Sequence, residues 1–141
     1  MRKKGNTLEF ADERREEVLR AIREEASACQ RLDLPMACRR AVLRPASRFW
    51  VSEERAARVI SAMFGGAGLP QRMEMSKRRM YEEIFRRTQA LRRGRGKSLP
   101  LAHAVREVVY QPAPEHYMSP VSAMNMYYAH LRGKQKLRAN G

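Results

Sequence analysis

Clustered arginine and lysine side chains are the residues in this sequence whose type and spacing suit a definite chemistry, the binding of phosphate groups. Residues 71–97 hold ten basic and three acidic side chains, a net charge of +7. Cations placed along one helix can follow a nucleic-acid backbone and release its counterions, which makes the affinity sensitive to salt. We predict such a stripe here, with few acidic partners on the same helix; the alternative is an ordinary solvated helix surface. The candidate phosphate contacts are Lys77, Arg78, Arg79, Arg86, Arg87, Arg92, Arg93, Arg95 and Lys97.

Positive charge extends over the whole chain. Its 141 residues include 29 Lys+Arg and 15 Asp+Glu, which gives a net charge of +14. An excess of this size repels itself and is best tolerated beside an acidic partner, of which nucleic acid is the first candidate and an anionic membrane surface the second. Residues 1–64 carry 14 basic and 10 acidic side chains (+4), whereas residues 65–141 carry 15 and 5 (+10). We therefore expect the second half to be the more electropositive.

The remaining composition indicates a helix-rich protein of the cytoplasm. Hydrophobic residues make up 43% of the chain, but aromatic residues only 7%, a balance that favours helices. No apolar stretch approaches the roughly 18 residues needed to span a bilayer. The apolar faces are interrupted and suit packing within the protein, so we expect no membrane partner. Cys29 and Cys38 form neither a disulfide framework nor a zinc pattern, which indicates reduced cysteines in a cytosolic compartment.

The segment GRGKS (94–98) imitates the end of a phosphate-binding loop. The full motif needs a glycine five positions before Gly96, where Leu91 stands, and a strand before the loop. A long basic helix is expected there instead. We therefore exclude a nucleotide site and expect Gly94 and Gly96 to end that helix.

The three histidines lack the partners that catalysis or metal binding requires. His103, His116 and His130 have no carboxylate or cysteine at ligand spacing. We expect His116 to occupy a partly exposed packing position. The sequence therefore predicts a protein without enzymatic activity, cofactor or metal.

An internal repeat organises the chain. Two segments align without a gap at a distance of 67 residues, RRAVLRPASRFWVSEERA (39–56) and REVVYQPAPEHYMSPVSA (106–123). Together with helical spacing of apolar residues in both halves, this match predicts an all-α fold of about six helices, made by tandem duplication of a three-helix, helix-turn-helix-like unit. The expected domains are a first repeat over 1–64, a Gly-rich linker over 65–70, a second repeat over 71–133 and a basic tail over 134–141.

The repeated segment has the features of a corner between two helices. Pro45 and its counterpart Pro112 stop the helix that precedes them, because the residue before a proline disfavours the α conformation. Ser52 and Ser119 are suited to cap the helix that follows. The aromatic residues between them, Phe49 and Trp50 in the first copy and Tyr117 in the second, are predicted to be core anchors.

A corner followed by a capped helix also describes a helix-turn-helix, in which the helix after the corner enters the major groove. In that interpretation Arg55 and Arg58 would face DNA from the first repeat, and Ser122 and Asn125 from the second. The corner here has about eight residues, which is longer than the usual three or four. Two acidic residues, Glu53 and Glu54, would also lie near phosphates.

The segments PASRFWVSEERAARVI, KRRMYEEIFRR and QPAPEHYMS resemble a family of short basic helical proteins from Bacteroidota and their phages and mobile elements. This resemblance covers both halves and brings no activity or site residues with it. It implies an intracellular bacterial or phage-linked setting, and it favours nucleic acid over membrane as the acidic partner.

The function predicted from the sequence is the binding of nucleic acid, with DNA favoured over RNA, by a regulatory or architectural protein. The alternative is a structural or adaptor protein that binds another protein in a phage or host assembly. Nine methionines, six of them in the second repeat, suit such an adaptable surface. The oligomeric state stays open.

Overall fold

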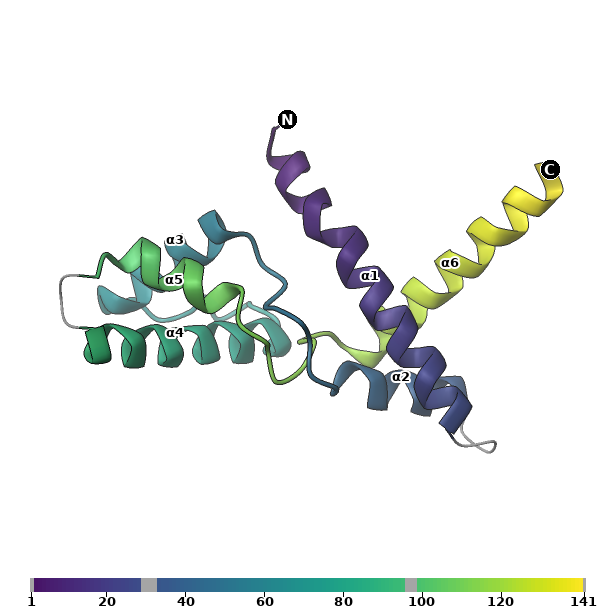
Figure 1. Cartoon of the computed structure of the whole chain (residues 1–141), viewed down its shortest axis with the longest axis horizontal. Helices are drawn as coiled ribbons and strands as arrows, with labels where there is room; N and C mark the ends of the chain where they lie inside the picture. The colour runs from purple at the N-terminus through teal and green to yellow at the C-terminus, as the bar shows by residue number, and fades with distance from the viewer. Residues whose placement is uncertain (1, 29–32, 96–98, 141) are drawn as a thin grey trace. The chain divides into compact units, whose positions relative to one another are not determined.

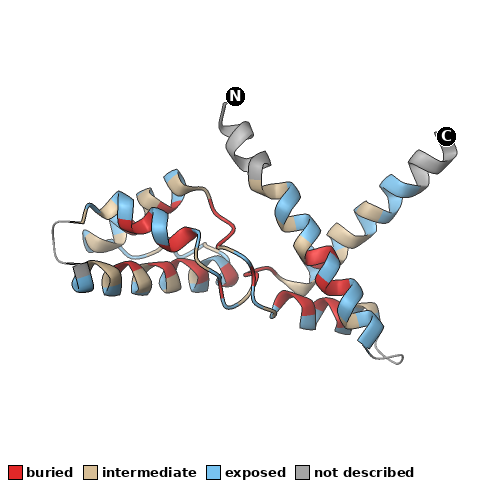
Figure 2. Ribbon diagram, in the orientation of Figure 1, coloured by how far each residue is buried: buried red, intermediate tan, exposed pale blue. Residues whose placement is uncertain are grey.

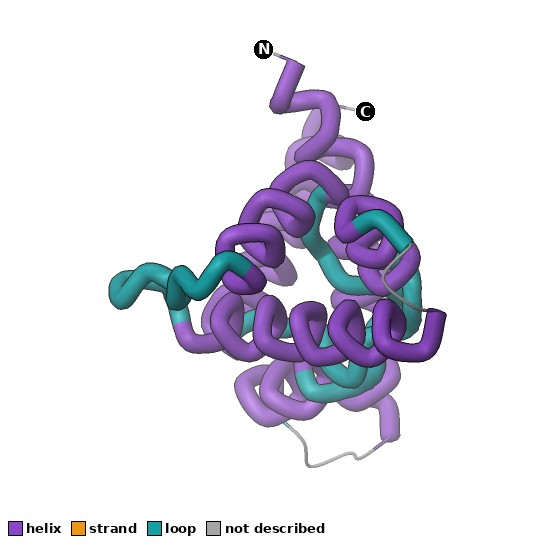
Figure 3. Tube along the Cα trace, turned by 90° about the vertical axis from the view of Figure 1, so that its left-hand side faces the viewer, coloured by secondary structure: helices purple, strands orange, loops and turns teal. Residues whose placement is uncertain are grey.

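The computed structural model describes residues 2–28, 33–95 and 99–140, and these residues form helices and loops without an extended strand (Figure 3). This confirms the predicted all-α class with about six helices. The helices are α1 (Arg2–Ala28), α2 (Leu34–Val42), α3 (Glu53–Phe64), α4 (Met75–Arg95), α5 (Leu101–Val109) and α6 (Pro120–Asn140) (Figure 1).

The chain divides into two compact units whose bounds differ from the expected repeats. Unit 1 consists of Met1–Arg44 and Met118–Gly141, and unit 2 of Pro45–Tyr117. In unit 1, α1 and α2 pack with α6; in unit 2, α4 and α5 pack with α3. Each third helix therefore belongs to the unit that contains the first two helices of the other expected repeat. The expected division into 1–64 and 71–133 does not coincide with the packed units.

The core of unit 1 forms around one face of α2. Asp33 caps this helix by accepting a hydrogen bond from the Met36 amide at 2.9 Å, and a proline follows in the first turn as predicted. Apolar side chains at helical spacing on α2 are buried against α1 and α6, which meet α2 where the red segments of Figure 2 gather. The buried members are Val18, Ala21, Ile22, Ala37, Cys38, Ala41, Val42, Met118 and Ala123.

The core of unit 2 repeats this plan around α5. Its buried face consists of Ala104, Val105, Val108 and Val109, and α5 packs against both α3 and α4. On α3, Ala56 and Ile60 are buried. Ser52 caps α3 as predicted, since its Oγ accepts a hydrogen bond from the Arg55 amide at 3.1 Å.

The two corner segments pair with each other inside unit 2. The amide of Ala46 donates to the carbonyl of Ala113 and the amide of Ala113 to the carbonyl of Ala46, both at 2.9 Å, so the segments run antiparallel. These two alanines are equivalent positions of the sequence repeat. The first corner connects α2 of unit 1 to α3 of unit 2, and the second connects α5 of unit 2 to α6 of unit 1. The pairing therefore accompanies the difference between the units and the repeats.

Ring contacts across the corners follow the same reciprocal pattern. Phe49 stacks on Tyr117 with ring centroids 6.0 Å apart, and Trp50 stacks on His116 at 6.4 Å. In the alignment, Phe49 corresponds to His116 and Trp50 to Tyr117, so each ring contacts the neighbour of its own counterpart. A two-fold relation between the two corner segments produces this pattern. Tandem duplication itself stays a prediction.

His116 is buried, with 2% of its surface exposed, so the expectation of a partly exposed position is wrong. Its Nδ1 lies 3.2 Å from the Trp50 Nε1–H, which donates to it. That hydrogen bond satisfies both polar groups and allows the rings to be buried together. α4 ends at Arg95, between the two glycines that were expected to end it: Gly94 is its penultimate residue, and Gly96 lies outside the described residues.

Tyr117 has a backbone φ of 54°, in the left-handed region that costs energy for a side chain of this size. The turn directs its ring onto Phe49. Burial, reinforced by the carboxylates of Glu83 and Glu115, raises the pKa of Tyr117 to about 12. The phenol is therefore neutral and acts as a packing group, as the sequence predicted for this aromatic position.

Thr88 gives a direct test of packing in unit 2. This α4 residue is fully buried, and its Oγ1 has no hydrogen-bond partner among the described residues. We expect Thr88→Val to raise the free energy of unfolding by about 1 kcal/mol, because valine has the same shape and removes the desolvated hydroxyl. Denaturant unfolding followed through the single tryptophan, Trp50, measures the change; Thr88→Ser, which keeps the hydroxyl, is the control. A less stable Thr88→Val variant would show that the hydroxyl has a partner.

Candidate nucleic-acid interface

Three of the predicted phosphate-binding arginines on α4 form ion pairs within unit 2. Arg79 contacts both carboxylate oxygens of Glu115, at 2.6 and 3.2 Å. Arg87 lies 2.7 Å from Glu83, and Arg86 pairs with the same carboxylate. The expectation of few acidic partners on this helix is wrong here, because Glu83 lies three and four residues before the two arginines and so on the same face.

Several of these arginines also support loops. Arg87 donates to the side chain of Gln111 at 3.1 Å and to the carbonyl of Pro112 at 2.9 Å. Its guanidinium lies 5.0 Å from the centre of the Phe49 ring. A planar guanidinium with five donors can satisfy several acceptors at once, so Arg87 ties α4 to the corner.

Two further predicted arginines contact loop carbonyls at the two ends of α4. Arg78 donates to the carbonyl of Pro70. Arg92 donates to the carbonyl of Leu99 at 3.2 Å and lies 5.6 Å from the centre of the Phe64 ring. These side chains contribute to the surface potential of unit 2, but some of their N–H groups already donate to loop carbonyls.

Arg55, Arg58 and Lys77 have exposed side chains and form no ion pair with a described residue. Both arginines lie near Tyr81 of α4. Burial raises the pKa of Tyr81, and the positive fields of Arg55 and Arg58 oppose that rise. Lys77 lies four residues before Tyr81, one turn away on the same side of α4. We call these three cations the α3–α4 cluster.

An acidic residue at the start of α3 is already neutralised by its own partners. Glu53 accepts a hydrogen bond from the Tyr110 hydroxyl and another from Arg106, 3.0 Å away. These contacts, the tyrosine hydrogen bond first, lower the pKa of the Glu53 carboxyl. Because Arg106 balances this charge, Glu53 opposes a nearby phosphate less than the sequence suggested.

The other predicted contacts do not join the α3–α4 cluster. Arg93 is exposed near the end of α4. Asn125 is exposed on α6 in unit 1, as is Ser122, whose amide donates to Ser119 Oγ at 3.0 Å. The side chain of Arg95 and the whole of Lys97 lie outside the described residues.

Net charge is shared equally between the two units. Unit 1 contains 15 basic and 8 acidic side chains, and unit 2 contains 14 and 7, so each carries +7. The expected concentration of charge in the second half does not describe the packed units. The reason is that α6, with basic but no acidic residues, belongs to unit 1.

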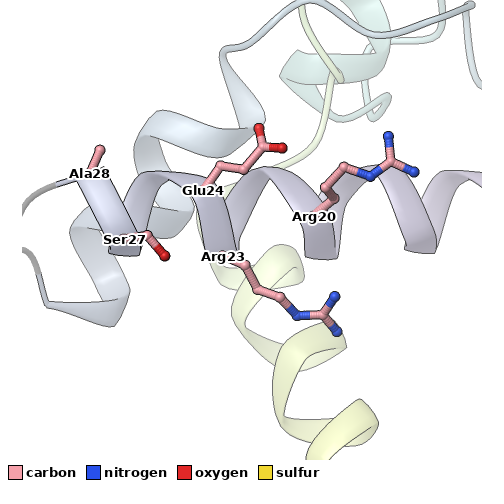
Figure 4. Close-up of a pocket in the computed structure, with 5 residues that line it drawn as sticks. All are labelled: Arg20, Arg23, Glu24, Ser27 and Ala28. Atoms are coloured by element: carbon pink, nitrogen blue, oxygen red, sulfur yellow. The ribbon is translucent and has the colours of Figure 1, made fainter.

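Sequence reasoning missed a second polar cluster, in unit 1. An open hollow on α1 is lined by Arg20, Arg23, Glu24, Ser27 and Ala28 (Figure 4). From its edge Arg23 extends toward α6, where its Nη2 lies 3.2 Å from His130 Nε2. The two residues are 107 positions apart, so no local signal could have joined them.

The described residues contain no group of three or more His, Cys, Asp or Glu side chains that could hold a metal ion. Within the same ranges, every helix is too short or too polar to cross a membrane. Comparison with known proteins found no matching family model, no matching curated protein and no matching solved structure. The resemblance to Bacteroidota proteins therefore stays a prediction.

Proposed function

We propose that this chain is a non-enzymatic nucleic-acid-binding protein, with duplex DNA as the favoured partner, in a regulatory or architectural role. The observation that carries the proposal is the α3–α4 cluster. Arg55, Arg58 and Lys77 are exposed and lack acidic partners among the described residues, in a chain of net charge +14. Like charges held close together on a protein surface raise its free energy, and a phosphate backbone lowers it again while releasing counterions.

Ion pairs formed by the other α4 arginines limit the number of phosphate contacts that we expect. Arg79, Arg86 and Arg87 are held by carboxylates of the same unit, so phosphate must compete with those partners. Exposed cations without such partners bind phosphate without that competition. The contact is therefore expected to be small and governed by charge, with the rest of α4 adding a weaker long-range field.

A salt series on the full chain tests the proposal. We expect fluorescence anisotropy of a labelled DNA duplex to report binding at low salt, with log K falling linearly against log salt concentration and a slope of about −0.9 for each phosphate contact. An RNA duplex of equal length distinguishes B-form from A-form recognition. Absence of binding to either duplex at low salt would remove the proposal.

One observation favours protein binding as a second candidate function. On α6, the apolar side chains of Val121, Tyr128 and Leu131 are exposed, and α6 contains no acidic residue. Exposed apolar side chains on one helix can mark a contact with another protein. Association with a protein partner that is saturable and insensitive to salt would favour this adaptor function over nucleic-acid binding.

A further inference from the structure

A cluster of positive side chains joins α1 to α6 in unit 1, outside the predicted site. Arg23 of α1 and His130 of α6 are in hydrogen-bond contact at 3.2 Å. Arg15 of α1 and Lys134 of α6 lie close enough for their charges to act on the His130 ring. Asp12, 2.7 Å from Arg15, is the acidic side chain paired with this group. We call Arg15, Arg23, His130 and Lys134 the α1–α6 cluster.

The charges of this cluster are only partly balanced. The charges of three permanent cations act on one imidazole, and among the described residues the carboxylate paired with one of them is that of Asp12. Partial burial lowers the pKa of His130, and the charges of Lys134, Arg23 and Arg15 lower it further. Near neutral pH the imidazole is therefore uncharged, and its Nε2 accepts the hydrogen bond that Arg23 donates.

We propose that the α1–α6 cluster is a second phosphodiester-binding site, which takes up one proton on His130 when a nucleic-acid phosphate binds. The proposal deepens the nucleic-acid function proposed above and rests on it for the identity of the ligand. It assigns a role to Arg15, Arg23, His130 and Lys134, all in unit 1, whereas the α3–α4 cluster lies in unit 2.

Proton uptake follows from the donor count at the Arg23–His130 pair. In the free protein one N–H of Arg23 donates a hydrogen bond to His130. The accepting Nε2 carries no proton, so it cannot donate a hydrogen bond to a phosphate. When a phosphodiester oxygen enters, a proton from solvent at Nε2 converts the imidazole into a second donor. Arg23 and His130 can then each donate to a phosphate oxygen, and the negative charge compensates the repulsion among the four cations.

The direction of the pH dependence can be worked out from the charged groups around the ring. Lys134 on its own helix and Arg15 and Arg23 on α1 hold the pKa of free His130 below its usual value; among the described residues, no charged group of α2 contributes to this shift. A bound phosphate raises the pKa, so the complex holds more protons than the free protein between the two values. Affinity therefore increases as pH falls through that interval and levels off below the lower value. Phosphodiesters stay ionised throughout, so the change belongs to the protein.

The test measures the titration of His130 by NMR in the full chain, with and without the single-stranded oligonucleotide tetrathymidylate. We expect the pKa of His130 to rise by on the order of one unit with saturating oligonucleotide. His130→Gln assigns the resonance. An unaltered His130 titration at saturation would overturn the proposal.

Variants on α1 and α6 separate this site from a general effect of charge. Arg23→Gln is expected to abolish the rise in the pKa of His130. Arg20→Gln removes the same charge one turn away, and the pKa of His130 should still rise in that variant. Arg20 is a suitable control because its guanidinium points away from that of Arg23 (Figure 4), and the charges that lower the pKa of His130 are those of Lys134, Arg23 and Arg15. His130→Gln keeps an acceptor for Arg23 but cannot take up the proton, so its affinity for duplex DNA should no longer increase between pH 7.5 and 5.5. An equal increase in the wild type and in His130→Gln would contradict the proposal.

Failure of this site and failure of the proposed function give different results. Salt-sensitive duplex binding with an unaltered His130 titration refutes the α1–α6 site and leaves the function standing. A rise in the pKa of His130 with the oligonucleotide, but no duplex binding at low salt, supports the site and refutes duplex DNA as the partner.

Discussion

Replacing Arg55 and Arg58 together by glutamine is expected to weaken duplex DNA binding about 30-fold near 0.15 M salt and to lower the salt slope by about 1.8, which corresponds to two lost phosphate contacts. The physical reason is that both guanidinium groups are exposed and lack an ion pair among the described residues, so each can neutralise a phosphate without first breaking a contact. Adding Lys77→Gln should lower the slope by about a further 0.9. Fluorescence anisotropy over a salt series measures each step.

The matched control is Arg39→Gln with Arg40→Gln. These two arginines are exposed on α2, and replacing them changes the net charge by the same amount. We expect the slope to stay within about 0.5 of the wild-type value, since only a long-range field is altered. Equal losses in the two double variants would show that total charge, not the α3–α4 cluster, determines the affinity.

Phe49→Ala is expected to lower the free energy of unfolding of unit 2 by about 3–5 kcal/mol, the range for a fully buried aromatic side chain. Phe49 has no exposed surface. Its ring stacks on Tyr117 and lies under the Arg87 guanidinium, and its amide donates to the carbonyl of Val109 at 3.0 Å. Truncation therefore leaves a cavity where the two corners meet.

Denaturant unfolding monitored by Trp50 fluorescence measures this loss, because Trp50 is the single tryptophan and lies in the same corner. Met75→Ala is the control, since Met75 is 69% exposed on α4 of the same unit and its truncation should change stability by less than about 0.5 kcal/mol. A Phe49→Ala variant as stable as Met75→Ala would mean that the corner does not support the core of unit 2.

The helices and their ends were predictable from the sequence because they depend on interactions between residues close together in the chain. Helical spacing of apolar residues, prolines that end a helix and serines that cap one act within about four residues of each other. These signals correctly predicted the Ser52 and Ser119 caps and the burial of Phe49, Trp50 and Tyr117.

The free cations could be found only in part. The sequence named Arg55, Arg58 and Lys77, but it did not separate them from Arg79, whose partner Glu115 lies 36 residues away. Ion pairs over such a distance depend on which helices pack together. The Arg23–His130 contact was missed for the same reason.

What the sequence alone determined was the six helices, the serine caps and the repeated corner motif, because each depends on contacts between near neighbours in the chain. Only the tertiary structure decided which third helix joins which pair. The two repeats present similar apolar stripes, so α3 and α6 can each bury their own stripe against either partner with a similar hydrophobic gain. The observed arrangement is accompanied by the backbone pairing of Ala46 with Ala113, a contact between segments 67 residues apart that no local pattern encodes.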